Sequence, residues 1–192
     1  MYNSPDPGDP VAYLPWWLDM FRGTGIIIVV VLPDDGQRTL ILRREARRME
    51  APFLTCRRTR GPGQFFAFLA NELGIPLGRT PAFQRTETMA RRLPRFVYLE
   101  QADLLTPTAL GILLGLKKNI EHSNREVSFV LSSGSRRLLQ NIERADRYGT
   151  FLRHCCFYTP GAEPTPNLEE RRRSAERCGL PPKIQFPAGE TD

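Results

Sequence analysis

Residues 26–32 read Ile-Ile-Ile-Val-Val-Val-Leu, and this stretch decides the class of fold. A continuous run of β-branched residues is typical of a strand that is buried on both faces, as in a parallel sheet. The turn sequence Pro-Asp-Asp-Gly at 33–36 ends the run. The run is far too short for a membrane span, which needs about 20 apolar residues. The sequence therefore predicts a central strand of a parallel sheet.

Strands and helices alternate along the rest of the chain. Apolar runs predict four more strands, at 51–56, 96–99, 127–131 and 154–158. Apolar spacing predicts helices at 40–49, 64–73, 86–93, 107–122 and 136–145, with Thr106 and Ser135 as caps and with Gly61-Pro-Gly63 as a loop. This alternation predicts an α/β fold in three layers, with helices on both faces of a mostly parallel five-stranded sheet.

The two ends of the chain differ from this central pattern. Residues 1–22 are expected to form an N-terminal loop and an aromatic helix that packs on the domain edge or on a partner. Residues 23–160 hold the α/β domain. Residues 161–192 are predicted to form a charged helix at 168–178 and a proline-rich tail.

Composition indicates a globular protein with a basic surface. Hydrophobic residues make up 41% and charged residues 25% of the 192 residues, and the net charge is +6. Arginine supplies 24 of the 27 basic residues, which suits phosphate or carboxylate partners, although a G- and C-rich genome would also favour arginine. The first ten residues do not resemble a secretory signal, so we expect a cytoplasmic protein without membrane contact.

Cysteine and histidine spacing does not suggest a metal site. The four cysteines form no C-x-x-C pair, and neighbours on a strand point to opposite faces, so we expect reduced thiols. His122 and His154 have no metal-ligand spacing and are interpreted as surface or interface residues. The cysteines are Cys56, Cys155, Cys156 and Cys178.

Polar residues follow three of the predicted strands, where α/β sheets bind their ligands. The three stretches are Leu32 to Thr39, Glu100 to Asp103 and Ser132 to Ser135. Ordinary turn and capping chemistry would also explain each of them.

Two longer segments resemble AAA+ P-loop ATPases. Residues 96–110, Phe-Val-Tyr-Leu-Glu-Gln-Ala-Asp-Leu-Leu-Thr-Pro-Thr-Ala-Leu, resemble the family's Asp-Glu-Ala-Asp segment, and residues 127–144 resemble its sensor strand and the following helix. Within that family, the sequence of these two segments is most similar to the transposition target-selection ATPases of the MuB/TniB kind. The resemblance implies a P-loop NTPase-like fold and a nucleotide site at Gly36, Gln37, Arg38, Thr39, Glu100, Gln101, Ser132 and Ser133.

The candidate nucleotide site departs from the family pattern in both halves. Arg38 stands where the phosphate-loop lysine belongs, and Leu32 and Gln37 replace its two glycines. Glu100 replaces the metal-linked aspartate, and Gln101 replaces the catalytic glutamate, whose proton-accepting role an amide cannot fill. We therefore expect a degenerate domain with no catalytic residue and no resident cofactor or metal, with binding of ATP and Mg²⁺ as the alternative.

The arginines suggest partners of another kind. The stretch from Arg38 to Arg60 holds eight arginines and two acids, a balance that suits the phosphate backbone of DNA or, alternatively, a solvated or protein-binding face. Arg147 and Arg153 fall near the place where AAA+ subunits offer an arginine finger to a neighbour. The predicted DNA-binding residues are Arg43, Arg44, Arg47, Arg48, Arg57, Arg58, Arg60, Arg91 and Arg92.

These observations lead to one main hypothesis and two alternatives. The main hypothesis is a catalytically degenerate AAA+-like regulatory or structural subunit of a mobile-element or phage system. Such a subunit would bind DNA or a nucleoprotein partner and assemble with copies of itself. The first alternative is an ATPase for transposition target selection that hydrolyses only within an assembly. The second is a protein–protein adaptor that binds neither nucleotide nor DNA.

Overall fold

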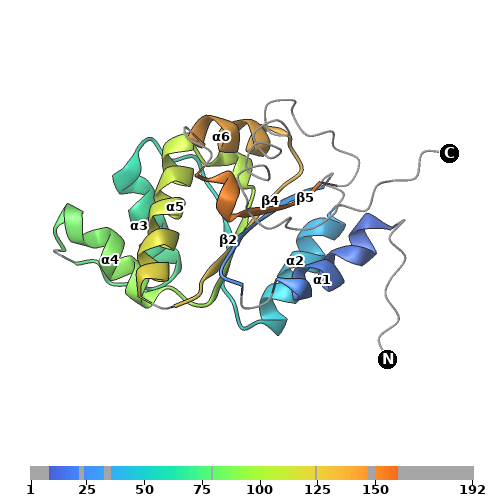
Figure 1. Cartoon of the computed structure of the whole chain (residues 1–192), viewed down its shortest axis with the longest axis horizontal. Coiled ribbons are helices and arrows are strands. Elements are labelled where there is room, and N and C mark those ends of the chain that lie inside the picture. The colour runs from blue at the N-terminus through green and yellow to red at the C-terminus, as the bar shows by residue number, and fades with distance from the viewer. Residues whose placement is uncertain are drawn as a thin grey trace.

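The computed structural model confirms an α/β fold in three layers (Figure 1). It describes residues 9–21, 24–32, 36–78, 80–123, 125–146 and 150–159. The strands are β1 (Ile27–Val31), β2 (Phe53–Thr55), β3 (Phe96–Glu100), β4 (Ser128–Ser133) and β5 (Cys155–Tyr158). The helices are α1 (Pro10–Met20), α2 (Gln37–Arg48), α3 (Pro62–Glu72), α4 (Ala82–Arg92), α5 (Pro107–His122) and α6 (Arg137–Ala145), with 3₁₀ turns η1 (Ala102–Leu104) and η2 (Leu152–His154).

The five strands form one sheet in the order β2-β3-β4-β1-β5, and every pair in it is parallel. All five residues of β1 are buried, as its continuous apolar sequence predicts. The register aligns Thr55 with Glu100, Glu100 with Ser132, and Val31 with Ser133. The carboxyl ends of these four strands therefore meet at one edge of the sheet.

Helices cover both faces of the sheet, as right-handed crossovers require (Figure 1). On one face, α1 and α2 pack against the alternate strand residues Ile28, Val30 and Val130. On the other face, α3, α4, α5 and α6 pack against Ile27, Val29 and the remaining alternate residues. The neighbours Cys155 and Cys156 contribute to opposite cores, as predicted.

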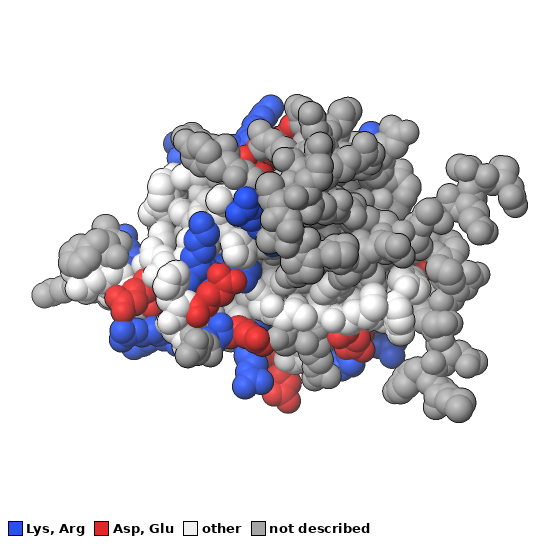
Figure 2. Space-filling model, viewed as in Figure 1, with Lys and Arg blue, Asp and Glu red and all other residues white. Residues whose placement is uncertain are grey.

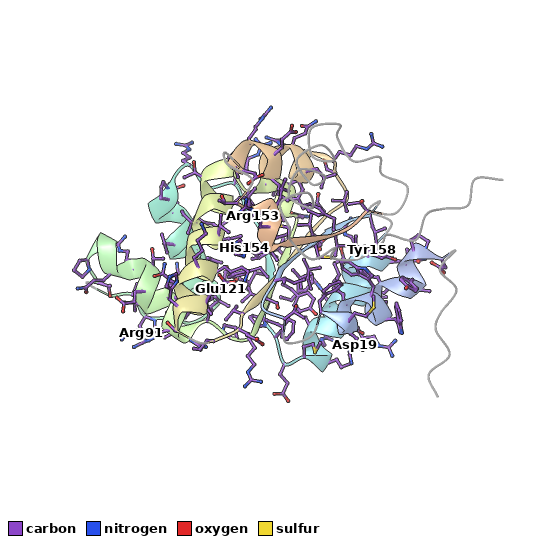
Figure 3. The ribbon with its side chains drawn as sticks, in the orientation of Figure 1. Asp19, Arg91, Glu121, Arg153, His154 and Tyr158 are labelled. Atoms are coloured by element: carbon purple, nitrogen blue, oxygen red, sulfur yellow. The ribbon has the colours of Figure 1, made fainter. Side chains whose placement is uncertain are left out.

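The aromatic helix α1 packs on the sheet beside the edge strand β5, which agrees with the predicted place at the domain edge. Its N-terminus is capped by Asp9, whose Oδ1 accepts hydrogen bonds from the amides of residues 11 and 12 at 3.0 and 3.1 Å. Trp17 is buried, and its ring centroid lies 4.8 Å from that of Tyr158 in β5. The Tyr158 hydroxyl also donates to the Pro10 carbonyl oxygen at 2.5 Å, which ties β5 to the start of α1 (Figure 3).

Several predicted boundaries were wrong by a few residues. The helix expected at 40–49 begins at Gln37, so its first turn includes Arg38 and Thr39. The strand expected at 127–131 extends to Ser133, because the hydrogen bonds with β1 continue over two more residues. Two further helices begin early, at Pro62 and Ala82, so the predicted loop at 61–63 is in part the first turn of α3.

The predicted caps had different outcomes. Thr106 caps α5 as predicted, and its hydroxyl accepts the Ala109 amide at 3.2 Å. Ser135 precedes the cap position of α6, which Arg136 occupies, and its hydroxyl accepts the Arg137 amide at 3.2 Å.

None of the helices within the described ranges combines the length and the hydropathy that a bilayer span requires. The predicted helix at 168–178, the tail and Cys178 lie outside the described residues.

Candidate functional site

The polar residues predicted at the strand ends do come together at the carboxyl edge of the sheet. Gly36 is the N-cap of α2 and has a φ of 81°, in the left-handed region that favours glycine. This turn starts the helix one residue before Arg38 and directs that side chain toward the end of β3. Glu100 ends β3, and Ser132 and Ser133 end β4.

An ion pair between Arg38 and Glu100 occupies the centre of this cluster. The Arg38 Nη2 atom donates to Glu100 Oε1 at 2.5 Å, and the exposed fractions of the two side chains are 1% and 5%. The Arg38 Nη1 atom donates to the carbonyl oxygen of Leu32 at 2.7 Å, just beyond β1. The guanidinium that could have held a phosphate is therefore directed into the protein, where it joins α2 to β1 and β3.

The Glu100 carboxylate has further donors from the chain itself. The Thr39 hydroxyl donates to Oε1 at 3.0 Å, and the Ser132 hydroxyl donates to Oε2. A carboxylate accepts at two oxygens, so three donors satisfy most of its hydrogen-bonding capacity. The buried charge is thus paired and hydrogen-bonded, which is the condition under which proteins tolerate it.

A second polar cluster lies beside the first and fixes the segment after β3. The Ser133 hydroxyl donates to Asp103 Oδ1 at 2.7 Å and accepts the Ser135 amide at 2.9 Å. Asn141 of α6 donates through Nδ2 to the carbonyl oxygens of Asp103 and Leu105, at 3.2 and 3.0 Å. No local sequence pattern indicates this role of Asn141, because its partners lie 38 and 36 residues away along the chain.

Gln101 and Cys56 take different positions around the ion pair. Gln101, at the place of the catalytic glutamate, has a φ of 56° and an exposed side chain, so it stands apart from the buried cluster. Cys56 is buried after β2, and burial, with smaller contributions from the charges of Glu100 and Asp103, raises the pKa of its thiol well above the ordinary value. That thiol stays protonated and is a poor nucleophile.

The residues of the site, as arranged, do not fit a magnesium–triphosphate complex. The carboxylate that would face the metal already accepts hydrogen bonds from Arg38, Thr39 and Ser132. The arginine that would face the phosphates is bound to that carboxylate. Within the described residues, no group of three histidine, cysteine or acidic side chains could hold a metal ion.

The predicted basic surface at 38–60 is divided by the fold. Arg38 is buried, so it is not part of any surface, contrary to its place in the predicted patch. Arg43 on α2 lies over the ring of Phe53 at 5.2 Å, on one side of the sheet. Arg57, after β2, lies over the ring of Phe68 of α3 at 5.4 Å, in the helix layer of the other side.

The other predicted arginines are exposed but differ in their partners. Arg48 pairs with Asp19 at 2.5 Å and with Glu45 at 2.7 Å. Arg91 pairs with Glu87 at 2.6 Å. The remaining exposed members are Arg44, Arg47, Arg58, Arg60 and Arg92.

The two candidate finger residues remain predictions. Arg153 is exposed in η2, which precedes β5 and therefore lies toward the amino edge of the sheet (Figure 3). Arg147 lies outside the described residues.

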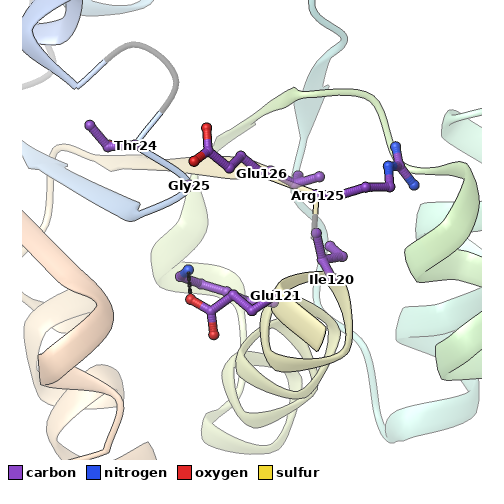
Figure 4. Close-up of a pocket in the computed structure, with 8 residues that line it drawn as sticks. Thr24, Gly25, Ile120, Glu121, Arg125 and Glu126 are labelled. Carbon is purple, nitrogen blue, oxygen red and sulfur yellow. Dashed lines mark hydrogen bonds and ion pairs between the residues drawn. The ribbon is translucent and has the colours of Figure 1, made fainter. Parts of the chain in front are cut away.

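A pocket opens at the amino edge of the sheet, opposite the edge that holds the ion pair (Figure 4). Lys117 is 3% exposed, and its ammonium donates to Glu121 at 2.5 Å. The Nδ1 atom of His154 lies 3.6 Å from the same carboxylate. The basic and acidic side chains around the pocket balance one another, so it carries no net charge for an ionic ligand. Its lining residues are Thr24, Gly25, Lys117, Ile120, Glu121, Arg125, Glu126 and Val127.

Comparison with known proteins identifies the type of fold. Neither a family model nor a curated protein matches the sequence. Among solved structures, the crystal structure of Cdc6p from Pyrobaculum aerophilum matches 83% of this chain with a TM-score of 0.58 and 15% sequence identity. The chain spans about half the length of that structure, of which 47% is covered. A likeness at this identity shows the fold alone, which is a P-loop NTPase-like α/β fold.

Proposed function

We propose that this protein is a non-hydrolysing AAA+-type subunit that binds DNA or a nucleoprotein partner. The observation that supports the proposal is the buried Arg38–Glu100 ion pair, whose two residues belong to the candidate nucleotide site that the resemblance implies. Phosphoryl transfer depends on positioned charges and on an activated water. Here the two charges neutralise each other, and Gln101 supplies an amide in place of a general base.

Opening the site for nucleotide would be costly. Separating Arg38 from Glu100 would leave two charges in a nearly solvent-free place, and breaking a buried pair costs about 3–5 kcal/mol. A ligand would have to supply that free energy from its own contacts. We therefore expect the protein to act through its surface and its assembly state and not through a nucleotide cycle.

The binding partner is inferred from charge. The chain carries a net charge of +6, almost entirely as arginine, and arginine suits the phosphate groups of nucleic acid. The sequence resemblance to transposition target-selection ATPases leads to two further predictions. The protein belongs to a mobile-element or phage system, and it assembles with copies of itself.

Calorimetric titration with Mg·ATP and a phosphate-release assay, each with and without duplex DNA, test the nucleotide part of the proposal. We expect a Kd for Mg·ATP weaker than about 1 mM and no phosphate release above the buffer rate. Micromolar binding would contradict the closed site. Phosphate release that Arg38→Ala abolishes would instead support the assembly-dependent ATPase.

DNA binding is tested separately by fluorescence anisotropy with a labelled duplex. We expect an affinity that falls steeply as salt rises, because phosphate contacts release counterions. Absence of binding even at low salt would refute the DNA part of the proposal, whatever the nucleotide result.

A further inference from the structure

We propose that the nucleic-acid backbone binds along the carboxyl edge of the sheet, through arginines that the fold gathers there from two distant parts of the chain. This inference rests on the proposed DNA binding and says where it takes place. The carboxyl-edge arginines are Arg57, Arg58, Arg60, Arg136 and Arg137. Arg136 and Arg137 are not among the residues that the sequence predicted for DNA binding.

Sheet topology brings the two groups of arginines together. The segment 56–61 follows β2, and the segment 134–137 follows β4, with only β3 between these strands. Neighbouring strands lie about 4.8 Å apart, so the two chain ends leave the sheet about 10 Å from each other. Thr55, Glu100 and Ser132 are in register, so both segments leave the sheet at the same level.

Both segments also turn toward the same face of the sheet. The helices that they enter, α3 and α6, bury Phe65 and Leu138 in the same hydrophobic core. Asn141 fixes α6 to the segment after β3 through two backbone carbonyls, so the start of α6 is held over the edge. The arginines therefore project from a rigid rim and not from separate surfaces.

Among the described residues, the exposed charged side chains of this rim are mainly basic. All five arginines are exposed, and within the described part of the chain no carboxylate forms an ion pair with any of them. Asp103 and Glu143 are the acids of the neighbouring η1 and α6, and the Asp103 carboxylate accepts from Ser133. In Figure 2, basic and acidic side chains both stand at the top, where Figure 1 places α6.

The start of α3 adds to the positive potential. Its N-terminus lies directly after Arg60, and no side chain caps it. A helix N-terminus carries about half a positive charge, which favours an anion. The hydroxyl of Thr59, between two of the arginines, is buried and has no hydrogen-bond partner among the described residues.

The amino edge of the sheet offers a weaker alternative. There Arg48 and Arg91 are already paired with acids, and Glu50 is exposed close by at the end of α2. Figure 2 shows basic and acidic side chains interspersed along the lower side of the molecule. A surface of mixed sign attracts a polyanion less than a mainly basic rim does.

The spacing of the rim suits a continuous phosphate backbone. A guanidinium offers a fork of donors that matches a phosphate bidentately. One strand of duplex DNA carries one phosphate for each 3.4 Å of the helix axis, so its phosphates are spaced closely enough for both groups of arginines to contact one backbone. Contacts of this kind depend on charge and are independent of base sequence.

Paired charge reversals test the assignment. One variant is Arg136→Glu with Arg137→Glu, and a second is Arg58→Glu with Arg60→Glu. The matched control is Arg95→Glu with Lys118→Glu, which changes the net charge equally but at exposed positions outside the carboxyl edge. Affinity for a labelled duplex DNA, for an RNA duplex of the same sequence and for polyglutamate is measured from about 50 to 200 mM salt. Circular dichroism verifies that each variant is folded.

We expect both edge variants to lose at least about tenfold in affinity and to lower the slope of log K against log salt by about one for each phosphate contact removed. The control should keep the wild-type slope.

Equal losses in all three variants would overturn the assignment, because net charge alone would then explain binding. Wild-type affinity in both edge variants would also overturn it while leaving DNA binding intact. Polyglutamate that competes as well as DNA would point to an acidic protein and refute a phosphate site. Failure of the wild-type protein to bind DNA would instead refute the proposed function. The DNA and RNA duplexes together identify which nucleic acid supplies the backbone.

Discussion

Removal of either partner of the Arg38–Glu100 pair should destabilise the protein strongly, and removal of both should cost far less. Glu100→Gln keeps the shape of the side chain and an oxygen that can accept from Thr39, but it leaves the Arg38 guanidinium without a counter-charge. Arg38→Met removes the cation, so the Glu100 carboxylate keeps only the hydroxyl groups of Thr39 and Ser132 as hydrogen-bond donors. The double variant leaves no buried charge at the site.

The magnitudes follow from burial. Arg38 and Glu100 are 1% and 5% exposed, so each single variant leaves a charge that water does not reach. An uncompensated buried charge costs about 3–5 kcal/mol. Replacement of a whole buried pair by neutral groups of similar volume is close to neutral, whereas the two single losses sum to about 6–10 kcal/mol, so the coupling free energy should be about 6 kcal/mol or more.

Urea unfolding followed by circular dichroism, together with calorimetry, measures these differences. For a chain of this length each 1 kcal/mol shifts Tm by roughly 2–4 °C, so each single variant should lose roughly 6–20 °C. The matched control is Asp19→Asn. Its partner Arg48 lies at the same 2.5 Å, but the two side chains are 43% and 45% exposed. An exposed pair contributes about 1 kcal/mol or less.

Two outcomes would refute the reasoning. One is additivity of the single variants within about 0.5 kcal/mol, which would mean that the two side chains do not interact. The other is a Glu100→Gln loss as small as that of Asp19→Asn, which would mean that water reaches the pair and that the nucleotide position is open.

Three smaller predictions test other features. Thr106→Ala should cost about 1 kcal/mol in urea unfolding because α5 loses its cap, whereas Thr106→Ser should restore the stability; equal losses in both would contradict the capping role. Gly36→Ala should lower the free energy of unfolding by about 1 kcal/mol because of the left-handed φ of 81°, since an added Cβ would meet no atom within 4 Å. An unchanged free energy of unfolding would show that the turn adopts another conformation. Burial works to raise the pKa of Glu121, but the hydrogen bond and charge of Lys117, aided by His154, outweigh it and hold that pKa below the ordinary 4.5. The stabilisation by the Glu121–Lys117 pair is therefore complete above pH 4.5 and is lost as pH falls through the lowered pKa. Glu121→Gln should make the stability fall less steeply over this acid range, and a pH profile identical to that of the wild type would disprove the pairing.

Local patterns were enough for most of the secondary structure. The β-branched run at 26–32 predicted a strand buried on both faces, and Thr106 with Pro107 predicted the start of α5. Boundaries were less certain where tertiary hydrogen bonds extend an element. Ser132 and Ser133 belong to β4 because they pair with β1, which their own polar character does not indicate.

The candidate site could be located from the sequence, but its chemistry could not. The strand ends identified Arg38 and Glu100 as neighbours of one site. Their direct pairing joins residues 62 positions apart and depends on how far α2 extends toward β1. The sequence favoured either a weakened phosphate site or a plain turn, and neither describes a site filled by its own ion pair.

The α/β alternation, the parallel sheet and the excess of arginine can be predicted from the chain alone, because they follow from short-range hydrophobic patterns and from composition. Which charges face one another depends instead on how the strands are ordered in the folded sheet. The strand order places β3 between β2 and β4, and this order divides the arginines of 38–60 while it brings Arg136 and Arg137 to the rim beside Arg57. Strand order is set by packing of the whole core. Arginines that are close together in the sequence are therefore not always close together on the surface, and arginines far apart in the sequence can be neighbours there.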